Sequence, residues 1–493
     1  MAATTGDLTL VLDAGTASTR AMVFARDGGL LAVAQRALTQ YYPRPGWVEH
    51  DPAELWDASL AVLREVVTAI GGVERIAGLG IANQRETVVA WDRVSAAPLA
   101  RAIVWQDRRT ADACAQLRAS GYEADVQART GLMLDPYFSA TKMRWLIDNI
   151  AEVAGAARGG NLALGTVESW LAFRLTGGGF VSDASNASRT SLLPLAGTRW
   201  DAGLCDLFGV PMAALGEVVD CAGTLGSVLP EWLGRAMPIT ALVGDQQAAT
   251  IGQGCLTPGD TKATYGTGAF VLVNMGASVP HSAQRLLGTV LYQINGARSY
   301  ALEGSMFVAG SLMQWLRDAI GLIANAPESA QLAASVADSG GVVIVPALSG
   351  LGAPHWRPDA RATITGLSFA TTRAHVVRAA LEAMACQTRD LAQAFAGDGT
   401  PWTRLRIDGG MSANDWMAQD LADVLELPVE RPDLVETTAL GAAMLAALGA
   451  GLFSSLAEAS AAMRGPVRLF SPAMDQDTRA ARLAAWQAAL AKV

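Results

Sequence analysis

The chain contains little cysteine, histidine or charge, and each shortage excludes a class of protein. Its 493 residues include five cysteines and four histidines. The cysteines lie far apart and form no Cys-x-x-Cys pair, so we expect neither a disulfide framework nor a structural zinc site. Charged residues make up 17% of the chain, the net charge is −9, and no run of Lys or Arg stands out. A nucleic-acid-binding surface needs such a basic stripe, so we expect no nucleic-acid partner.

Signals for export or membrane insertion are also missing. The N-terminus carries Asp7 and Asp13 without a basic segment, which excludes a typical secretory signal and favours a cytoplasmic location. One uncharged stretch, residues 437–457, approaches the length of a membrane span. It is rich in Ala and Gly and is bounded by Glu436 and Glu458, so we predict a buried helix there and no membrane partner.

Apolar residues are plentiful, at 51% of the chain, and 50 glycines are spread through short loops. A chain of this length exceeds one ordinary hydrophobic core, so we expect two large domains. Helical and strand patterns alternate, which predicts the α/β class; for example, Asp51 followed by proline predicts a helix start, and residues 76–82 form the next strand. We place the boundary in segment 252–259, which divides the chain into 1–252 and 253–493.

Two turns of similar composition follow short apolar strands far apart in the chain. The first spans residues 13–20, between strands predicted at 8–12 and 21–24. The second spans residues 265–268 and precedes a strand predicted at 269–274. Both turns expose amide and hydroxyl groups that suit phosphate oxygens, although each one alone also fits an ordinary hairpin. Their similarity indicates two related halves.

Two aspartates suit phosphoryl transfer, which needs a carboxylate that holds a metal ion and a base near the attacking hydroxyl. Asp13 adjoins the first turn and suits Mg²⁺, while Arg20 can reach a phosphate oxygen. Asp245 ends an apolar strand, and its carboxylate suits the acceptance of a proton from a hydroxyl nucleophile. The plain alternatives are that Asp13 caps its own turn and that Asp245 is a helix N-cap.

Arg85 and Glu86 form an adjacent pair of opposite charge directly after a predicted strand. One donates to hydroxyl oxygens and the other accepts from hydroxyl hydrogens, which is what a polyol requires. Trp105, Tyr137 and Phe270 suit the carbon faces of such a substrate, although core packing is the better expectation for any one of them alone.

The C-terminal half has segments that suit a nucleotide. A helix predicted at 306–322 places Gly310 and Gln314 on one face. The turn 408–412 follows a short strand, and Asn414 stands near the start of the next helix. A nucleotide-contacting turn and an ordinary strand-ending turn are equally favoured here.

Together these segments resemble the FGGY family of carbohydrate kinases. The matching stretches occur in the family's order over nearly the whole chain, which is more specific than any one of them. They are PGWVEHDP (45–52), IANQRETVV (81–89), AIVWQDRRT (102–110), GLMLDPYFSATK (131–142), SDASNASRT (182–190), GDQQAA (244–249), TYGTGAF (264–270), ALEGSMFVAG (301–310), GLGAPHW (350–356) and DGGMSAND (408–415).

The resemblance implies two actin-like, ribonuclease-H-like domains with a nucleotide cleft between them. Residues 253–493 would make most adenine-nucleotide contacts, and the polyol would lie deeper, in 1–252. The implied activity is in-line transfer of the γ-phosphoryl group of ATP to a polyol, with Mg²⁺ as cofactor and an aspartate as general base. The family also implies a homo-oligomer, either a dimer or a tetramer.

Matching motif positions imply the role of each residue. Asp245 corresponds to the catalytic base and Asp13 to the metal-associated aspartate. The polyol pocket is matched by Arg85, Glu86, Trp105, Tyr137, Asp245, Gln246 and Phe270. The nucleotide-contacting positions are matched by Thr16, Ala17, Ser18, Arg20, Thr267, Gly310, Gln314, Gly410 and Asn414. Ala14 and Ala17 stand where glycerol-phosphorylating members have Gln and Thr, so Ala17 lacks one hydroxyl donor.

The joint presence of the pocket residues favours glycerol as substrate and glycerol 3-phosphate as product. Another polyol or a ketose, such as erythritol or xylulose, is the alternative. An actin-like fold also serves filament subunits and chaperone-type ATPase switches. Neither role needs a polyol pocket, so the pocket residues favour a kinase.

Overall fold

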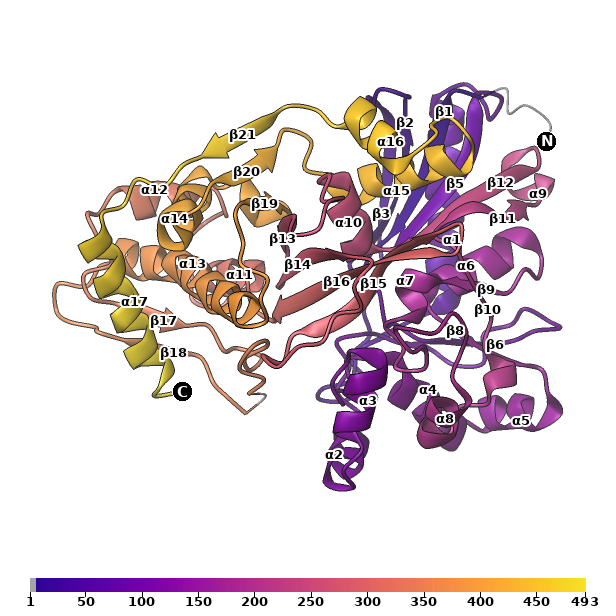
Figure 1. The fold of residues 1–493 in the computed structure, drawn as a ribbon, viewed down its shortest axis with the longest axis horizontal. Coiled ribbons are helices and arrows are strands. Elements are labelled where there is room, and N and C mark those ends of the chain that lie inside the picture. The colour runs from indigo at the N-terminus through magenta and orange to yellow at the C-terminus, as the bar shows by residue number, and fades with distance from the viewer. Residues whose placement is uncertain (1–5, 358) are drawn as a thin grey trace.

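The computed structural model describes residues 6–357 and 359–493; residues 1–5, with which the expected first domain begins, lie outside the described residues. Two lobes are visible in Figure 1, and each is built around one large sheet. The first lobe is indigo to magenta and holds most of the N-terminal half, while the second lobe is mainly orange. The α/β class is confirmed.

The first sheet has six strands, of which β1, β5 and β12 run parallel and the others antiparallel to their neighbours. Their order is β11 (Ala222–Val228), β12 (Met237–Gly244), β5 (Ile76–Asn83), β1 (Leu8–Ala14), β2 (Ser18–Phe24) and β3 (Leu30–Ala37). The predicted first hairpin is confirmed, because β1 and β2 pair with Asp13 opposite Arg20.

The second sheet has seven strands, with β13, β19 and β20 parallel. Their order is β15 (Leu287–Ile294), β16 (Ala297–Met306), β14 (Ala269–Gly276), β13 (Thr261–Tyr265), β19 (Leu405–Asp408), β20 (Val429–Pro432) and β21 (Val467–Phe470). The second predicted hairpin is β13 with β14, which pair antiparallel around Gly266 and Thr267.

The two sheets share one arrangement. The first contains the order β3-β2-β1-β5-β12, and the second contains β16-β14-β13-β19-β20. In both, the strand before the Gly-Thr turn pairs antiparallel with the next strand on one side and parallel with a later strand on the other. The prediction of two related halves is therefore confirmed.

Helix α1 (Pro52–Ala69) begins as the sequence predicts and covers one face of the first sheet. The Asp51 carboxylate accepts hydrogen bonds from the backbone N–H groups of Ala53 at 2.8 Å and Glu54 at 3.4 Å, which satisfies the free donors of the first turn. The buried side of the helix, which includes Leu55 and Leu63, packs into the core of this lobe.

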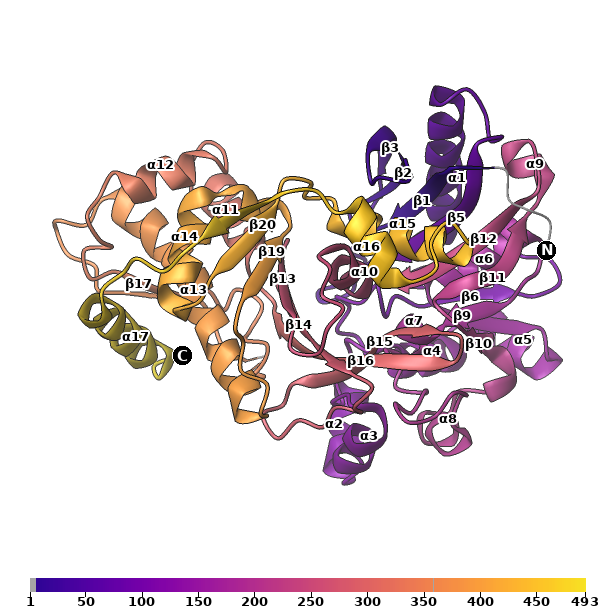
Figure 2. The ribbon, with the colours of Figure 1, turned by 45° about the horizontal axis from the view of Figure 1, so that its top comes forward.

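The other face of the first sheet is covered by a helix from late in the chain. Helix α15 (Thr437–Gly449) packs against β1, β5 and β12, and against α10 (Asp245–Gly252). Figures 1 and 2 both show this yellow helix lying on the first lobe. The buried helix predicted at 437–457 is thus present but shorter, because the chain turns at Gly451 (φ +78°) before α16 (Leu456–Met463). No helix in the described part of the chain is long and apolar enough to cross a membrane.

The second lobe is built on α13 (Arg373–Gly397), α14 (Asp415–Leu425) and α17 (Gln476–Leu490). The helix predicted at 306–322 is α11 (Gly310–Asp318). The predicted start was wrong, because residues up to Met306 continue β16 and pair with β14. Gly310 and Gln314 nevertheless remain one turn apart on this helix, as predicted.

The remaining elements are short connections and an insertion between β5 and β11. The helices are α2 (Ala111–Ala119), α3 (Glu123–Thr130), α4 (Ser139–Asn149), α5 (Ala151–Gly159), α6 (Val167–Thr176), α7 (Ala184–Ala187), α8 (Ala202–Phe208), α9 (Pro230–Leu233) and α12 (Glu328–Ala334), with 3₁₀ turns η1 (Met212–Ala214) and η2 (Gly410–Ala413). The short strands are β4 (Glu49–His50), β6 (Val89–Asp92), β7 (Ala102–Ile103), β8 (Leu162–Gly165), β9 (Val181–Asp183), β10 (Glu217–Val219), β17 (Val343–Val345) and β18 (Thr363–Thr365). All five cysteines are buried and unpaired, as expected.

Candidate active site

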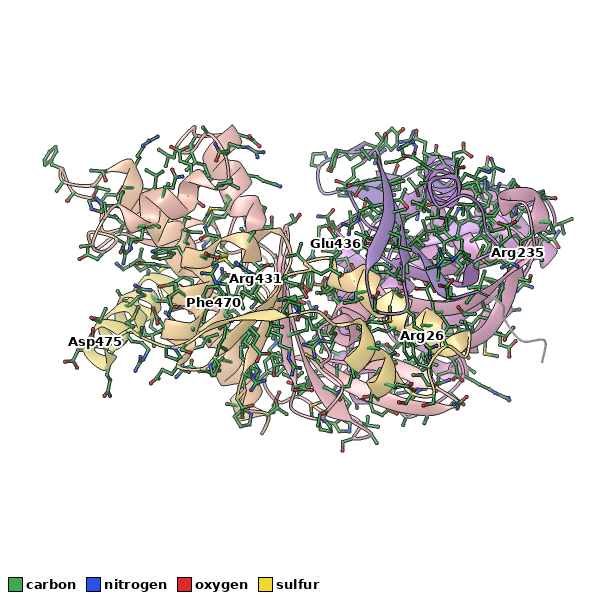
Figure 3. All side chains as sticks on the ribbon, turned by 90° about the horizontal axis from the view of Figure 1, so that it is seen from above. Arg26, Arg235, Arg431, Glu436, Phe470 and Asp475 are labelled. Carbon is green, nitrogen blue, oxygen red and sulfur yellow. The ribbon has the colours of Figure 1, made fainter. Side chains whose placement is uncertain are left out.

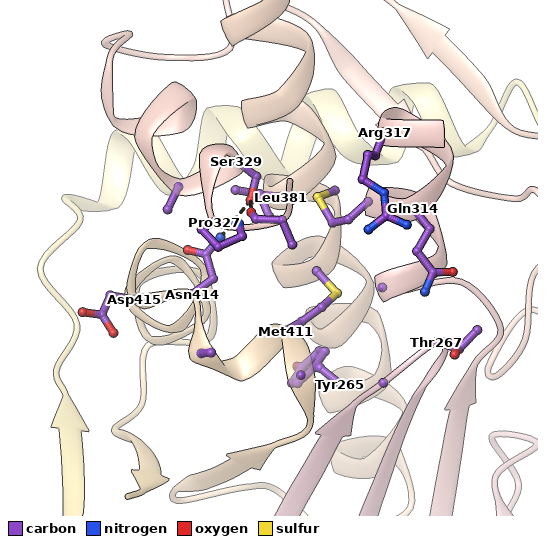
Figure 4. Close-up of a pocket in the computed structure, with 17 residues that line it drawn as sticks. Tyr265, Thr267, Gln314, Arg317, Pro327, Ser329, Leu381, Met411, Asn414 and Asp415 are labelled. Carbon is purple, nitrogen blue, oxygen red and sulfur yellow. Dashed lines mark hydrogen bonds between the residues drawn. The ribbon is translucent and has the colours of Figure 1, made fainter. Parts of the chain in front are cut away.

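A cavity of about 560 Å³ lies in the second lobe between α11, α12 and the turn η2 (Figure 4). All the nucleotide-contacting positions matched in the C-terminal half line it, namely Thr267, Gly310, Gln314, Gly410 and Asn414. Its walls also include the apolar side chains of Met411 and Leu381, which suit a purine ring.

Local geometry explains why these residues meet. The Asn414 side chain caps α14 by accepting from the backbone N–H of Met417 at 3.1 Å, and its amide nitrogen donates to Ser329 Oγ at 3.2 Å. The backbone of Gly310 lies against the second Gly-Thr turn, where a Cβ atom would come within 2.6 Å of the Gly266 carbonyl oxygen. Only glycine permits this close approach.

The first turn lies on the other lobe, and its residues do not line this cavity. Arg20 is held by two carboxylates, donating to Asp13 Oδ2 at 2.6 Å and to Glu436 Oε2 at 2.5 Å. Figure 3 places Glu436 at the junction of the lobes. Thr16 and Ser18 also have side-chain partners: Trp105 Nε1 donates to Thr16 Oγ1 and Gln35 Nε2 donates to Ser18 Oγ, both at 2.9 Å. Ala17, at the tip of the turn, is exposed.

Asp245 is the first residue of α10, which lies at the junction of the two lobes (Figure 2). Its side chain is 29% exposed, and Oδ1 lies 3.4 Å from Arg85 Nε. Burial raises the pKa of this carboxyl to about 6; Arg85 opposes the rise, and the charges of Glu86 and Asp13 add to it. Asp245 is therefore a stronger base than an ordinary aspartate and is still ionised at neutral pH.

Arg85 and Glu86 follow β5 and are buried, with 2% of each side chain exposed. Glu86 has a positive φ of 61°, a conformation that costs energy in a residue other than glycine and that is often found at functional sites. Arg85 donates to Glu303 Oε2 at 2.5 Å and to the Tyr137 hydroxyl at 3.3 Å. The pair therefore stands beside Asp245 with fixed orientations.

The three predicted aromatic residues come together from distant segments. The ring centroid of Trp105 lies 5.7 Å from that of Tyr137 and 6.1 Å from that of Phe270, and the rings meet edge to face. The guanidinium of Arg85 lies 5.9 Å from the Phe270 ring. Since Trp105 belongs to the first lobe and Phe270 to β14, the two lobes jointly form this aromatic cluster.

The structure also places three residues next to these candidate positions that the sequence analysis did not single out. Lys262, wholly buried in β13, donates to Gln246 Oε1 at 2.6 Å, and burial lowers its pKa to about 8. Gln84 donates to the Gly15 carbonyl at 3.0 Å and so joins the first turn to the segment that carries Arg85 and Glu86. Glu303, which lies in β16, accepts hydrogen bonds from Arg85. For Glu303 the available signal was a charged residue between apolar and small residues of a strand, whereas Lys262 stands in the mixed segment Thr261–Tyr265, which gives no such signal.

Comparison with known proteins places these features in a family. The model of the N-terminal domain of the FGGY family of carbohydrate kinases matches residues 8–252, and the model of its C-terminal domain matches 261–450. A glycerol kinase of Rhodospirillum centenum is 53% identical over 483 residues, which cover 98% of this chain and 97% of that protein.

Solved structures of carbohydrate kinases share the fold of this chain. The glycerol kinase of Plasmodium falciparum with ADP superposes with a TM-score of 0.90 at 35% identity, over 99% of this chain and 98% of the other. A xylulose kinase of Rhodospirillum rubrum has a TM-score of 0.84 at 28% identity, over 98% of each chain. The expected actin-like, two-lobed fold is confirmed. From these matches and from the site geometry, the chain belongs to the FGGY family of carbohydrate kinases.

Proposed function

We propose that this chain transfers the γ-phosphoryl group of ATP to glycerol and releases ADP and glycerol 3-phosphate. The observation that carries the proposal is the Asp245 carboxyl, with its raised pKa, standing beside a buried Arg85–Glu86 pair and an aromatic cluster. Relatives about 50% identical over nearly the whole chain are named glycerol kinase, which supports glycerol as the acceptor.

The acceptor binds between charged and aromatic groups. Arg85 donates to hydroxyl oxygens, and Glu86 accepts from hydroxyl hydrogens. The edges and faces of Trp105 and Phe270 cover the carbon chain and exclude water from it. This combination orients one terminal hydroxyl toward Asp245.

Asp245 acts as the general base. As the hydroxyl oxygen forms its bond to the γ-phosphorus, the hydroxyl proton passes to the Asp245 carboxylate. The bond from the γ-phosphorus to the oxygen that bridges to the β-phosphate breaks, and its electron pair leaves with ADP. Closure of the lobes excludes water, which otherwise would compete as the acceptor.

The two lobes divide the nucleotide between them. The cavity lined by Gln314 and Asn414 takes the adenosine part, and the turns at Thr16 and Thr267 supply hydroxyl and amide donors to the phosphates. We accordingly propose a division of the chain into 1–252, which holds the acceptor, and 253–493, which makes most nucleotide contacts; the family models match within these ranges.

Asp13 fits a Mg²⁺ ion that arrives with ATP. It uses Oδ2 for Arg20, and it stands next to the first turn with a side chain that is 6% exposed. Among the described residues, no cluster of three His, Cys, Asp or Glu side chains is placed to hold a metal ion. This agrees with Mg²⁺ chemistry, in which one or two carboxylates combine with phosphate oxygens and water. When bound, the ion supplies positive charge to the transferring phosphoryl group.

The proposal includes a cytoplasmic location and a homodimer or homotetramer, which rest on the family resemblance. Subcellular fractionation and light scattering of the purified protein test these two parts.

A kinase acting on another polyol or a ketose is the second candidate, since a xylulose kinase shares the fold. The identity to that protein is 28%, against 53% to a glycerol kinase, which favours glycerol. The test is ADP release from MgATP with glycerol, erythritol, dihydroxyacetone, xylulose or no acceptor. We expect the highest kcat/KM with glycerol, and we expect D245N to lose activity by about 10²- to 10⁴-fold, the usual contribution of a general base. A higher kcat/KM with xylulose would contradict the glycerol assignment.

A further inference from the structure

A ring of four buried, charged side chains lies at the proposed acceptor pocket, the site made of Asp245, Arg85, Glu86 and the aromatic cluster. Arg85 donates to Glu303 through Nη1 at 2.5 Å and through Nη2 at 3.1 Å. Arg189 donates to the same Glu303 through Nη2 at 2.9 Å and to Glu86 through Nε at 2.6 Å. No more than 2% of any of these side chains is exposed.

The ring joins the two lobes. Glu303 belongs to β16 of the second sheet, whereas Arg85 follows β5 and Arg189 follows α7 of the first lobe. One carboxylate from the second lobe therefore holds two guanidinium groups from the first. Burial disfavours the ionised form of Glu303, but Arg189 and Arg85 outweigh this and lower its pKa to about 2, so the group stays negative.

The paired hydrogen bonds to Glu303 set the direction of the Arg85 guanidinium. A guanidinium carries its N–H donors in one rigid plane. With Nη1 and Nη2 bound to Glu303, the Nε edge faces Asp245 Oδ1 at 3.4 Å and Glu86 Oε1 at 3.9 Å. Arg85 thus stands near Asp245 without forming a two-pronged pair with it.

Stability alone is a weak reason for such a ring. The loss of hydration of buried charges offsets much of their mutual attraction, and apolar side chains of the same volume are often at least as stabilising. A ring of fixed charges beside the pocket instead fixes geometry, which phosphoryl transfer requires.

We propose that Glu303 and Arg189 are positioning residues for the acceptor, in which Glu303 holds Arg85 away from Asp245 and Arg189 holds Glu86 in place for the substrate. This inference rests on the proposed function. Without Glu303, Asp245 is the nearest carboxylate left to Arg85, and a two-pronged pair would block the oxygens that accept the proton. Without Arg189, Glu86 loses its donor while the geometry of Arg85 and Asp245 is kept.

The test is steady-state kinetics of the full chain, with thermal unfolding of every variant. E303Q is expected to lower kcat and raise the KM for glycerol, with a combined loss of about 10- to 100-fold, because misplacing a reacting group by about 1 Å costs that much. The KM for ATP is expected to stay within about twofold of the wild-type value, because the variant removes no contact to the nucleotide. E303D keeps the charge and is expected to recover most of the loss. R189Q is expected to raise the glycerol KM with a smaller effect on kcat.

Glu382 supplies a matched control. It is a buried glutamate of the second lobe, 7% exposed, that binds Arg378 at 2.9 Å and Arg482 at 3.1 Å. E382Q therefore breaks a comparable ion cluster away from the pocket. It is expected to lower the melting temperature and to leave the glycerol kinetics unchanged.

Three results would overturn the proposal: equal kinetic losses in E303Q and E382Q, no recovery in E303D, or a rise in the ATP KM as large as the rise for glycerol. If the Gln variants do not fold, R189K carries the comparison, because a lysine ammonium lacks the rigid plane of donors with which Arg189 binds Glu86 and Glu303. Wild-type glycerol kinetics in R189K would then overturn the proposal. A wild-type protein that does not phosphorylate glycerol refutes the proposed function instead. The same variants and criteria then apply to the acceptor that the wild type does use.

Discussion

The activity of this chain is expected to fall steeply in mild acid, because the proposed base titrates near neutral pH. Burial raises the pKa of Asp245 to about 6, against an ordinary value of 3.8. The base works only when it is ionised, so kcat/KM for glycerol follows the ionised fraction and falls as the pH drops through 6.

The size of the fall distinguishes a raised pKa from an ordinary one. At pH 5 a group with a pKa of about 6 is ionised to roughly one-tenth, which lowers kcat/KM by about tenfold relative to pH 8. An aspartate with the ordinary value would still be about nine-tenths ionised at pH 5, and the rate would hardly change. The contrast arises mainly from the burial of Asp245, which raises its pKa; Arg85 opposes the rise, and the nearby charges of Glu86 and Asp13 add to it.

The assay is kcat/KM for glycerol between pH 5 and pH 8, with excess Mg²⁺ so that the nucleotide stays in its magnesium complex. Thermal unfolding at each pH checks that the protein remains folded. D245E supplies the control, because it keeps a carboxylate and should retain an acid limb at a lower rate. A profile that stays flat down to pH 5 in the folded wild type would refute the argument.

Three further expectations follow from contacts already described. D245N should melt at a higher temperature than the wild type at pH 8, and the difference should shrink toward pH 4. The reason is that the pKa of Asp245 is about 6 in the folded state, above the ordinary value of 3.8, so ionisation of this carboxyl between pH 3.8 and pH 6 destabilises the folded state. G310A should raise the KM for ATP and leave the KM for glycerol unchanged, because the added Cβ would lie 2.6 Å from the Gly266 carbonyl oxygen. G155A is the matched control, since a Cβ there meets no atom within 4 Å. Equal KM values for ATP in the two variants would contradict this prediction. W105F removes the 2.9 Å hydrogen bond from the indole N–H to Thr16 and should lower kcat/KM for ATP and for glycerol by about fivefold, the value of one ordinary hydrogen bond. A loss for glycerol alone would mean that this hydrogen bond does not couple the nucleotide site to the acceptor site.

Local secondary structure was predictable from the sequence wherever residues close together in the chain determine it. The two Gly-Thr hairpins and the Asp51 cap were predicted correctly because strand, turn and cap signals lie within a few residues of each other. The start of the helix predicted at 306–322 was wrong, since apolar residues before Gly310 fit either a strand or a helix and pairing with β14 decides between them.

Long-range pairing was beyond the sequence. Glu303 and Arg189 are 114 residues apart, and only the packing of one lobe on the other brings them together. The return of α15 to the first sheet had no local signal either, because an Ala- and Gly-rich buried helix fits any apolar surface. The order of the family motifs supplied the candidate site residues, and the structure adds the side chains that contact them.

The path of the chain between the lobes has a consequence for how they move. Residues 253–260 lead from α10 to β13, residues 433–436 lead back from β20 to α15, and residues 464–466 return from α16 to β21. Three connections resist sliding and twisting of the lobes more than one connection does, so we expect the lobes to move by bending about an axis near these crossings. The same path means that a fragment cut after residue 252 would lack α15 and expose the face of the first sheet that this helix covers. The N-terminal half, although it has its own sheet, therefore depends on the rest of the chain for a complete core.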